Sequence, residues 1–424
     1  MKAKEIGGEY MESTKSTTKS NENTTSTSTV AAIKRLQKEY EGDIIAWRRY
    51  LHQYPEVSFE EQATTKYLAG ELDKLGIPYE INPEKNTGIV AWIEGAKPGK
   101  TIMLRADIDA LNVTEQTGCE FTSKHEGKMH ACGHDAHMAV LLGAAKMLKT
   151  LQQEIEGKVF LVFQPAEESA EGAEYMKKFG TWFAETDSVF GGHIWIDLPA
   201  GKVSVEAGER MAAALEIAIE VEGKAGHGAQ PHLTVDATVV ASAIVMNLQT
   251  IVSRHFSPLD SVVVTIGKMT SGDRYNVISG RAKLEGTARY FKHAVGDELK
   301  KAMGQVVEET AKAYGATAKA SFRQMVLPTI NKPECSELAH RVGAELIGEE
   351  NVVLMEKTMA GEDFAYYLEE KPGCFAFFGI ANPELDAVHS HHSNFFKIDE
   401  SALPIGAAMY AQYALQWLKE NKDK

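Results

Sequence analysis

Thr101-Ile-Met-Leu-Arg-Ala-Asp-Ile-Asp109 is an apolar run that turns polar at its carboxyl end, and this pattern recurs along the chain. The other examples are Lys158-Val-Phe-Leu-Val-Phe163 before Gln164-Pro-Ala-Glu167-Glu168, Ser188-Val-Phe190 before Gly191-Gly-His193, and Cys374-Phe-Ala-Phe-Phe378 before a loop with His389-Ser-His391-His392. Short apolar strands that alternate with helical segments indicate an α/β fold, with a mostly parallel sheet and helices on both faces. Ligands of such sheets bind at the carboxyl ends of the strands. We therefore expect a site where these acids and histidines lie.

The middle of the chain follows a different pattern. Leu215, Ile217, Ile219 and Val221 alternate as in a half-buried strand, and the segments up to residue 322 then follow the order β-α-β-β-α-β. That order is typical of a ferredoxin-like α+β domain. We therefore expect an inserted domain over 211–321 and a larger domain built from 31–210 and 322–424.

The N-terminal segment and the bulk composition set further expectations. Residues 13–29 are nearly all Ser, Thr, Asn, Lys and Glu, so a disordered tail is predicted over 1–30, followed by a helix from Ala31. The net charge of −14 argues against nucleic acid or an anionic membrane as a partner. Four scattered cysteines, and no apolar signal or run of about 18 apolar residues, predict a cytoplasmic protein.

Cys132 and His134 are two residues apart in the segment His130-Ala-Cys-Gly-His-Asp135. From an irregular loop, this spacing lets both side chains face one ion. A thiolate with an imidazole favours zinc or a similar transition metal. The alternative is a buried thiol beside a loop histidine, which is the commoner case for an isolated Cys-Gly-His.

Glu167 and Glu168 form an adjacent acidic pair just beyond a predicted strand. Adjacent side chains point in different directions, so one can bind metal while the other faces substrate and moves a proton. A helix N-terminus is the alternative, since Glu is favourable there. The further histidines that the strand pattern places nearby, His193, His391 and His392, make a metal site the better explanation of the whole set.

Several longer segments carry a family resemblance. They are Leu51-His-Gln-Tyr-Pro-Glu-Val-Ser-Phe-Glu60, Arg105-Ala-Asp-Ile-Asp-Ala-Leu111, Met129-His-Ala-Cys-Gly-His-Asp-Ala-His137, Gln164-Pro-Ala-Glu-Glu168, Gly192-His193, Gly223-Lys-Ala-Gly-His-Gly-Ala-Gln-Pro-His232, Gly286-Thr-Ala-Arg289, Gly361-Glu-Asp-Phe364 and His392-Ser-Asn-Phe-Phe396. With them the chain resembles the aminoacylase and carboxypeptidase-like superfamily of metallo-amidohydrolases. It looks closest to the branch of hippurate hydrolases and indoleacetyl-amino-acid hydrolases. The resemblance runs from about residue 45 to the end.

The resemblance implies two divalent metal ions per subunit, zinc or manganese first, with cobalt or nickel as alternatives. The positions that match the metal ligands of the family are Cys132, His134, Glu168, His193 and His392. Asp107 and Asp135 are expected to lie behind these ligands and orient them.

The resemblance also implies the catalytic and substrate-binding residues. Glu167 matches the general base. His227 matches a histidine that reaches the active site of the partner subunit and stabilises the oxyanion. Asn276 and Arg289 match positions that contact substrate, and Arg289 is the natural partner of a substrate carboxylate. A homodimer, or a tetramer, follows, with 211–321 as its dimerisation (lid) domain.

The chain departs from the family pattern at two positions. Asn394 stands where the family usually has a proline after its last ligand, which leaves His391 open as an alternative to His392. Arg105 stands where the exopeptidase branches have a metal-binding histidine, so Cys132 belongs to a different ligand set.

These observations together predict a metal-dependent amidohydrolase that cleaves small N-acyl-L-amino acids. The alternatives are a dipeptidase or carboxypeptidase on the same scaffold, an N-acetyl-diaminopimelate deacetylase, and a binding protein that has lost catalysis. The presence of Glu167 with the full ligand set argues against the last.

Overall fold

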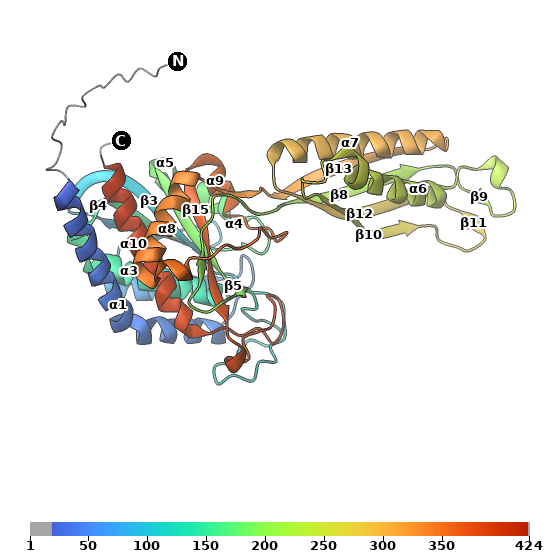
Figure 1. Ribbon diagram of the computed structural model, residues 1–424. Coiled ribbons are helices and arrows are strands. Elements are labelled where there is room, and N and C mark those ends of the chain that lie inside the picture. The colour runs from blue at the N-terminus through green and yellow to red at the C-terminus, as the bar shows by residue number, and fades with distance from the viewer. Residues whose placement is uncertain (1–18, 423–424) are drawn as a thin grey trace, which may run out of the picture.

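The computed structural model describes residues 19–422, in which a slender second domain projects from an α/β domain (Figure 1). The α/β domain is built on a seven-stranded sheet of order β1-β2-β4-β3-β5-β15-β6. The four neighbouring strands from β4 to β15 are parallel, and the outer pairings are antiparallel. The strands are β1 (Tyr79–Ile81), β2 (Ile89–Glu94), β3 (Lys97–Asp107), β4 (Glu156–Gln164), β5 (Ser188–Pro199), β6 (Val203–Ser204) and β15 (Gly373–Ala381). The predicted mostly parallel sheet is confirmed.

Alternate residues of the central strands enter two apolar clusters, one on each face of the sheet. In β4, Val159 and Leu161 belong to one cluster and Phe160 and Val162 to the other. Helices of the first face are α1 (Lys19–Gln53), α2 (Gln62–Leu75), α3 (His134–Thr150), α8 (Pro333–Ile347) and α10 (Leu403–Asn421). Helices of the second are α4 (Gly172–Lys177), α5 (Trp182–Glu185) and α9 (Ala365–Glu370). Strands buried on both faces are apolar throughout, which explains the runs seen in the sequence.

The second domain is a four-stranded antiparallel sheet of order β10-β12-β8-β13, with two helices packed on one face. Its elements are β8 (Ala213–Glu222), α6 (Ala237–Thr250), β10 (Val263–Ser271), β12 (Arg281–Tyr290), α7 (His293–Ala313) and β13 (Thr317–Val326). This confirms the predicted ferredoxin-like order. The predicted boundary at 321 falls inside β13, which continues to Val326.

Smaller elements complete the chain. The two connections between the domains pair as β7 (Gly208–Met211) and β14 (Thr329–Asn331), and a short ladder of β9 (Gly226–His227) and β11 (Val277–Ile278) forms the far tip of the second domain (Figure 1). Short 3₁₀ turns are η1 (Gln152–Glu154), η2 (Pro231–Leu233), η4 (Glu349–Asn351), η5 (Pro383–Leu385) and η6 (Glu400–Ala402), and η3 (Ile251–His255) is a π-helix.

The structure corrects the predicted start of the fold. Helix α1 begins at Lys19, so residues 19–30 are helical where disorder was predicted, and residues 1–18 lie outside the described residues. Once a helix is nucleated, each Ser or Thr lowers its stability by only about 0.5 kcal/mol relative to Ala. The amphipathic part after Ala31 supplies that nucleus through the buried residues Ile33 and Leu36.

One helical stretch among the described residues, Ala237–His255, is long and apolar enough to meet a membrane-span criterion, with a mean hydropathy of 1.2. Only 33 % of its 18-residue window is buried in the chain. Val240 and Ile244 pack on the sheet, whereas Val239 and Met246 face outward. The helix is therefore apolar on its core-facing side and on part of its exposed side, which is why it meets this criterion.

Candidate metal centre

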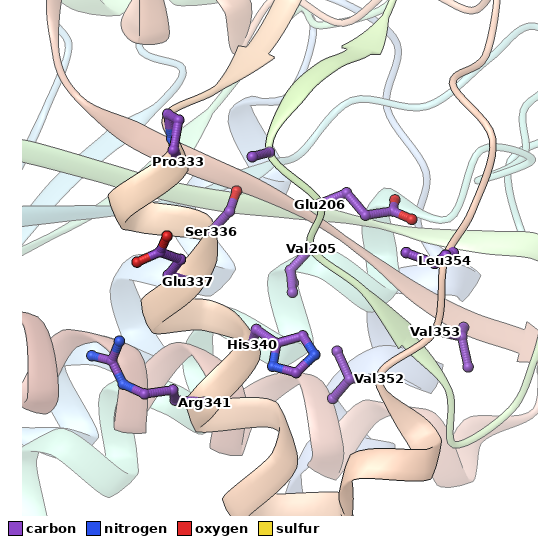
Figure 2. Close-up of a pocket in the computed structure, with 11 residues that line it drawn as sticks. Val205, Glu206, Pro333, Ser336, Glu337, His340, Arg341, Val352, Val353 and Leu354 are labelled. Carbon is purple, nitrogen blue, oxygen red and sulfur yellow. The ribbon is translucent and has the colours of Figure 1, made fainter. Parts of the chain in front are cut away.

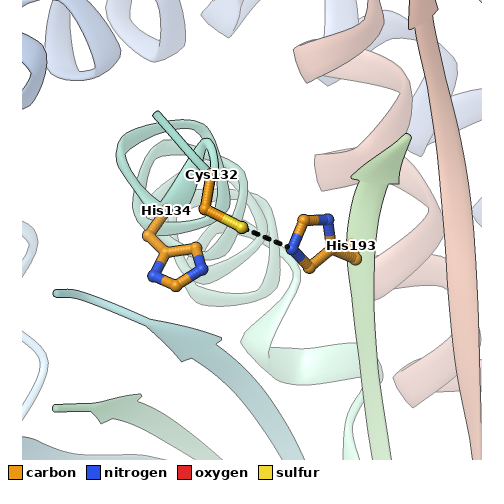
Figure 3. Close-up of side chains that lie close together, drawn as sticks. All are labelled: Cys132, His134 and His193. Atoms are coloured by element: carbon orange, nitrogen blue, oxygen red, sulfur yellow. Dashed lines mark hydrogen bonds between the residues drawn. The ribbon is translucent and has the colours of Figure 1, made fainter. Parts of the chain in front are cut away.

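The turn that begins α3 brings the first two predicted ligands together. Gly133 takes φ +94°, and a Cβ at this position would lie 2.2 Å from Cδ1 of Ile194. Only glycine allows this conformation and this close approach. Cys132 and His134 thereby flank one turn, and the Cys132 Sγ lies 3.4 Å from Nε2 of His193 on β5 (Figure 3).

His193 lies inside a strand, and the prediction that it follows a strand end is wrong. Strand β5 continues to Pro199, but its pairing with β3 stops at Leu104 and Phe190. Beyond that point β3 stays paired with β4 as far as Asp107 but separates from β5, so His193 borders the site from the edge of β5 that faces this gap. Its Nδ1 donates to the Ile194 carbonyl oxygen at 2.5 Å, which leaves the Nε2 lone pair directed toward Cys132.

Two backbone positions at the centre are strained. Ala166, just before the acidic pair, has φ +57°, and His392 has φ +65°. Non-glycine residues in this region cost about 1–3 kcal/mol each and cluster at functional sites. The buried Glu61 carboxylate accepts from the Ala166 N–H at 2.9 Å and holds the first of these turns.

The predicted ligands converge in overlapping groups. Ligand atoms lie within 4.8 Å of one another in three sets, which are Cys132 with His134 and His193, Cys132 with Glu168 and His392, and His134 with Glu167 and Glu168. His392 Nε2 is 3.5 Å from Glu168 Oε1. His391 instead packs against Trp195, and its Nε2 lies 3.4 Å from the Ile196 N–H. This arrangement favours His392 of the two alternatives.

The chemistry of these groups fits a cation. His134 Nε2 and Glu168 Oε1 are buried and have no hydrogen-bond partner in the part of the chain that the structure describes. Burial raises the pKa of the Cys132 thiol well above its usual value, and the Glu168 and Glu167 carboxylates raise it further. A divalent ion would give these two atoms a partner. It would also stabilise the thiolate of Cys132 among the carboxylates.

Asp109 is the positioning residue that the sequence prediction missed. Its Oδ1 accepts from His134 Nδ1 at 3.1 Å, and its Oδ2 accepts from the Glu168 N–H at 3.0 Å and the Ser58 hydroxyl at 2.7 Å. One carboxylate therefore orients two predicted ligands and fixes the Nε2 lone pair of His134 toward the site. The signal lies in the Asp107-Ile-Asp109 at the end of β3, of which the family resemblance points only to Asp107.

The two predicted orienting acids contact other groups. Asp107 Oδ1 accepts from His137 Nδ1 at 2.5 Å and lies 3.7 Å from His134 Nδ1, so its main partner is His137. Asp135 accepts from His52 at 2.7 Å and pairs with Arg48 at 2.9 Å, on the outer side of α3. Its side chain turns away because Asp135 is in the first turn of a helix, one residue after His134.

We expect Asp109→Asn to weaken metal binding by about 10–100-fold, because the amide no longer accepts equally well from His134 and the Glu168 backbone. Metal affinity measured by competition with a chelator checks this. Asp297→Asn, on the exposed surface of α7, is the control and should leave affinity unchanged. Equal affinity of Asp109→Asn and the unsubstituted protein would contradict the role of Asp109.

Glu167 lies among buried charges behind the ligands. Burial, followed by the Glu362 and Glu168 carboxylates, raises its pKa well above the usual value. Arg105 is fully buried and pairs with Asp107, Glu362 and Asp363, at distances of 2.6–3.0 Å. Its guanidinium compensates this acidic cluster, which explains an arginine where related branches carry a histidine.

The three predicted site residues of the second domain lie in two different parts of it. Arg289 lines a cavity of about 440 Å³ between the domains, together with Glu167 and Glu168. His227 and Asn276 lie at the far tip, where the Gly228 N–H donates to the Asn276 carbonyl oxygen at 3.0 Å (Figure 1). They are remote from the metal centre of their own chain.

A second cavity, of about 470 Å³, lies on the outer side of the α/β domain between α8 and the segment around Val352 (Figure 2). It is lined by Glu206, Glu337 and His340 among others, and by none of the predicted site residues. It is not part of the metal centre.

Comparisons with known proteins agree with this geometry. The IAA-amino acid hydrolase ILR1-like 4 of Arabidopsis thaliana is 38 % identical over 383 residues, which cover 89 % of this chain and 86 % of that protein. The N-acetyl-L-cysteine deacetylase of Bacillus subtilis (strain 168) is 40 % identical over 388 residues, 90 % of each chain. The crystal structure of the Bacillus subtilis YXEP protein, described as a dinuclear metal binding peptidase, superposes with a TM-score of 0.81 at 33 % identity, over 90 % of this chain and 99 % of that one.

Residues 103–416 match the model of Peptidase family M20/M25/M40. This range includes every predicted ligand, Glu167 and the whole second domain. The resemblance to the amidohydrolase branch is therefore confirmed. The chain belongs to Peptidase family M20/M25/M40 and is a hydrolase of amide bonds.

Proposed function

We propose that this protein hydrolyses the amide bond of N-acyl-L-amino acids, giving a carboxylate and a free amino acid. The observation that carries the proposal is the cavity shared by Glu167, Glu168 and Arg289. It combines a partly buried proton-transfer group beside a candidate metal centre with a cation suited to the α-carboxylate of an amino acid.

The predicted ligands Cys132, His134, Glu168, His193 and His392 would hold two divalent ions, with zinc or manganese preferred over cobalt or nickel. When bound, such ions lower the pKa of water toward neutrality and polarise the substrate carbonyl. The YXEP protein, described as a dinuclear metal binding peptidase, supports this number of ions.

Glu167 performs the proton transfers in this mechanism. Its carboxylate accepts a proton from the attacking water and returns it to the amide nitrogen as the C–N bond breaks. A raised pKa makes the Glu167 carboxylate a better acceptor of the proton of the attacking water, and the protonated group then supplies that proton to the leaving nitrogen.

Arg289 would hold the carboxylate of the amino-acid part. Its guanidinium donates to the Thr287 hydroxyl and the Ala288 carbonyl oxygen and has no acidic partner among residues 19–422, and burial lowers its pKa. An arginine that is half-buried without a carboxylate partner has donors free for a substrate anion.

We expect Arg289→Ala to lower kcat/KM for N-acyl amino acids by about 10²-fold, mainly through KM, because a charge-assisted hydrogen bond to a carboxylate contributes about 1.5–3 kcal/mol. The matching substrate with a carboxamide in place of the carboxylate should be affected little. Steady-state kinetics on both substrates check this, with Arg281→Ala at the exposed end of β12 as the control. An equal loss on both substrates would contradict carboxylate recognition.

We propose further that the active form is a homodimer, or a tetramer of such dimers, in which the tip of one subunit reaches the site of the other. His227 Nδ1 accepts from the Ala229 N–H at 3.0 Å, so the ring proton is on Nε2, ready to donate to an oxyanion. The exposed side chains Met246 of α6 and Met269 of the edge strand β10 offer the apolar surface for such an association.

The proposed substrate class is tested with a panel of acetyl-, benzoyl-, long-chain acyl- and indoleacetyl-amino acids, assayed against dipeptides and N-acetyl-diaminopimelate with zinc, manganese, cobalt and nickel. We expect at least one N-acyl amino acid to exceed every dipeptide in kcat/KM by about 10²-fold or more, since a free amino terminus adds a charge that the cavity must desolvate. A preference for dipeptides would instead assign a peptidase.

The proposed location is the cytoplasm, since all four cysteines are free thiols.

A further inference from the structure

A second group of metal-ligating side chains lies outside the centre described above. It comprises His52 at the end of α1 and Glu115 and Cys119 in the segment between β3 and α3. One ligand atom from each residue lies within 4.8 Å of the others. His52 Nε2 is 3.3 Å from Glu115 Oε1, and the Cys119 Sγ is 3.7 Å from the same oxygen.

These separations match those of ligands around one tetrahedral ion. Metal–ligand lengths of about 2.0–2.1 Å for nitrogen and oxygen and about 2.3 Å for sulfur place N and O about 3.4 Å apart and S and O about 3.6 Å apart. His52 and Cys119 are therefore each already spaced from Glu115 as ligands of one ion are. Imidazole, carboxylate and thiolate together suit zinc or cadmium.

His52 is also oriented as metal-binding histidines are. Its Nδ1 donates to Asp135 Oδ2 at 2.7 Å, and its Nε2 donates to Glu115 Oε1 at 3.3 Å, so loss of the Nε2 proton gives a lone pair directed at Glu115. A carboxylate behind the ring is the usual support of a histidine ligand. The same Asp135 oxygen pairs with Arg48 at 2.9 Å, so a carboxylate compensates the positive charge of Arg48 beside His52.

The remaining groups are held in place by hydrogen bonds. Glu115 Oε2 accepts from the Ser123 N–H at 2.6 Å, and the Thr117 hydroxyl contacts both Glu115 and Cys119. A cavity of about 90 Å³, lined by His52, Thr117 and Cys119, provides an entry path and room for a water as fourth ligand.

We propose that His52 Nε2, the Glu115 carboxylate and the Cys119 thiolate form a further metal site, distinct from the dinuclear centre, that binds zinc or cadmium. Binding displaces the thiol proton and the Nε2 proton shared with Glu115 to solvent, and forms metal–sulfur and metal–nitrogen bonds. The segment that carries Glu115 and Cys119 is joined to the loop of His392, because the Gln116 N–H donates to the Asn394 carbonyl oxygen at 2.8 Å. The site therefore braces the loop that supplies a predicted ligand of the dinuclear centre.

Cadmium titration of the full chain tests this proposal, with the ultraviolet cadmium–thiolate absorption and the number of bound ions as readouts. We expect Cys132→Ser, which removes the thiol of the dinuclear centre, to retain a cadmium–thiolate band. Cys119→Ser should bind one ion fewer per subunit, or bind it at least about tenfold more weakly. Cys335→Ser, a buried cysteine far from both sites, is the control and should match the unsubstituted protein.

The outcomes separate this site from the dinuclear centre and from a simple ion pair. Loss of the band in Cys132→Ser would overturn the proposal, as would an unchanged ion count in Cys119→Ser, and either would mean that His52 only bridges Asp135 and Glu115. A second variant, Glu115→Gln, should weaken the third ion as Cys119→Ser does, and circular dichroism of each variant confirms that it is folded.

Discussion

Glu167→Gln should lower kcat by about 10³-fold and leave metal binding unchanged, because positioned general acid–base catalysis contributes about 10²–10⁴-fold. Glutamine has the same size and keeps a hydrogen-bonding oxygen, so the Asp363 N–H, 3.4 Å from Glu167 Oε1, retains its contact. What the amide lacks is the capacity to take up a proton. The loss should therefore fall on kcat rather than on KM.

Steady-state kinetics on the best N-acyl amino acid, with metal content measured on the same samples, provide the test. Glu171→Gln replaces a nearby exposed glutamate at the start of α4 and should keep full activity. Turnover of Glu167→Gln equal to that of the unsubstituted protein would remove Glu167 from the mechanism. A parallel loss of metal would instead assign Glu167 to the ligand set.

His227→Ala should lower kcat by about 10²–10³-fold, the usual cost of removing one donor to an oxyanion. The side chain is exposed at the tip of the second domain and its Nδ1 is satisfied by the Ala229 N–H, so its removal leaves no buried group unpaired. Folding, metal content and dimerisation should therefore be unchanged. The interaction develops only as the carbonyl oxygen becomes charged, so KM should change little.

His232→Ala is the matched control for this substitution. His232 is exposed on the same tip, in η2, and has no predicted role. We expect normal kinetics for His232→Ala and a clear loss for His227→Ala in the same assay. Equal kinetics for the two variants would exclude an oxyanion contact from His227.

The parts of the fold that could be predicted are those in which burial leaves a pattern of apolar residues in the sequence. The central parts of β3 and β4, residues 102–104 and 159–163, and most of β15 are buried on both faces, so they are apolar runs that could be recognised from the sequence. The alternation in β8 likewise predicts one face on the core and one exposed. The helical start at Lys19 could not be read this way, since its Ser and Thr residues carry no apolar periodicity.

The site was predictable where side chains of one segment converge, and unpredictable where distant segments meet. Cys132 and His134 share one turn. His193 looked like a strand-end residue because its position depends on where β3 separates from β5, which is a property of the sheet rather than of the segment. Arg105 gave no signal of burial, because its partner Asp363 is 258 positions away in the sequence.

A mixed dimer tests the central claim most directly, which is that Glu167 of one subunit and the partner subunit's His227 act on the same amide bond. Glu167→Gln and His227→Ala chains are co-expressed with different tags, and the mixed dimer is isolated. One of its two sites then has both defects and the other has neither, so activity should return to about half that of the unsubstituted dimer. Activity no higher than that of the two parent variants would contradict a site shared between subunits.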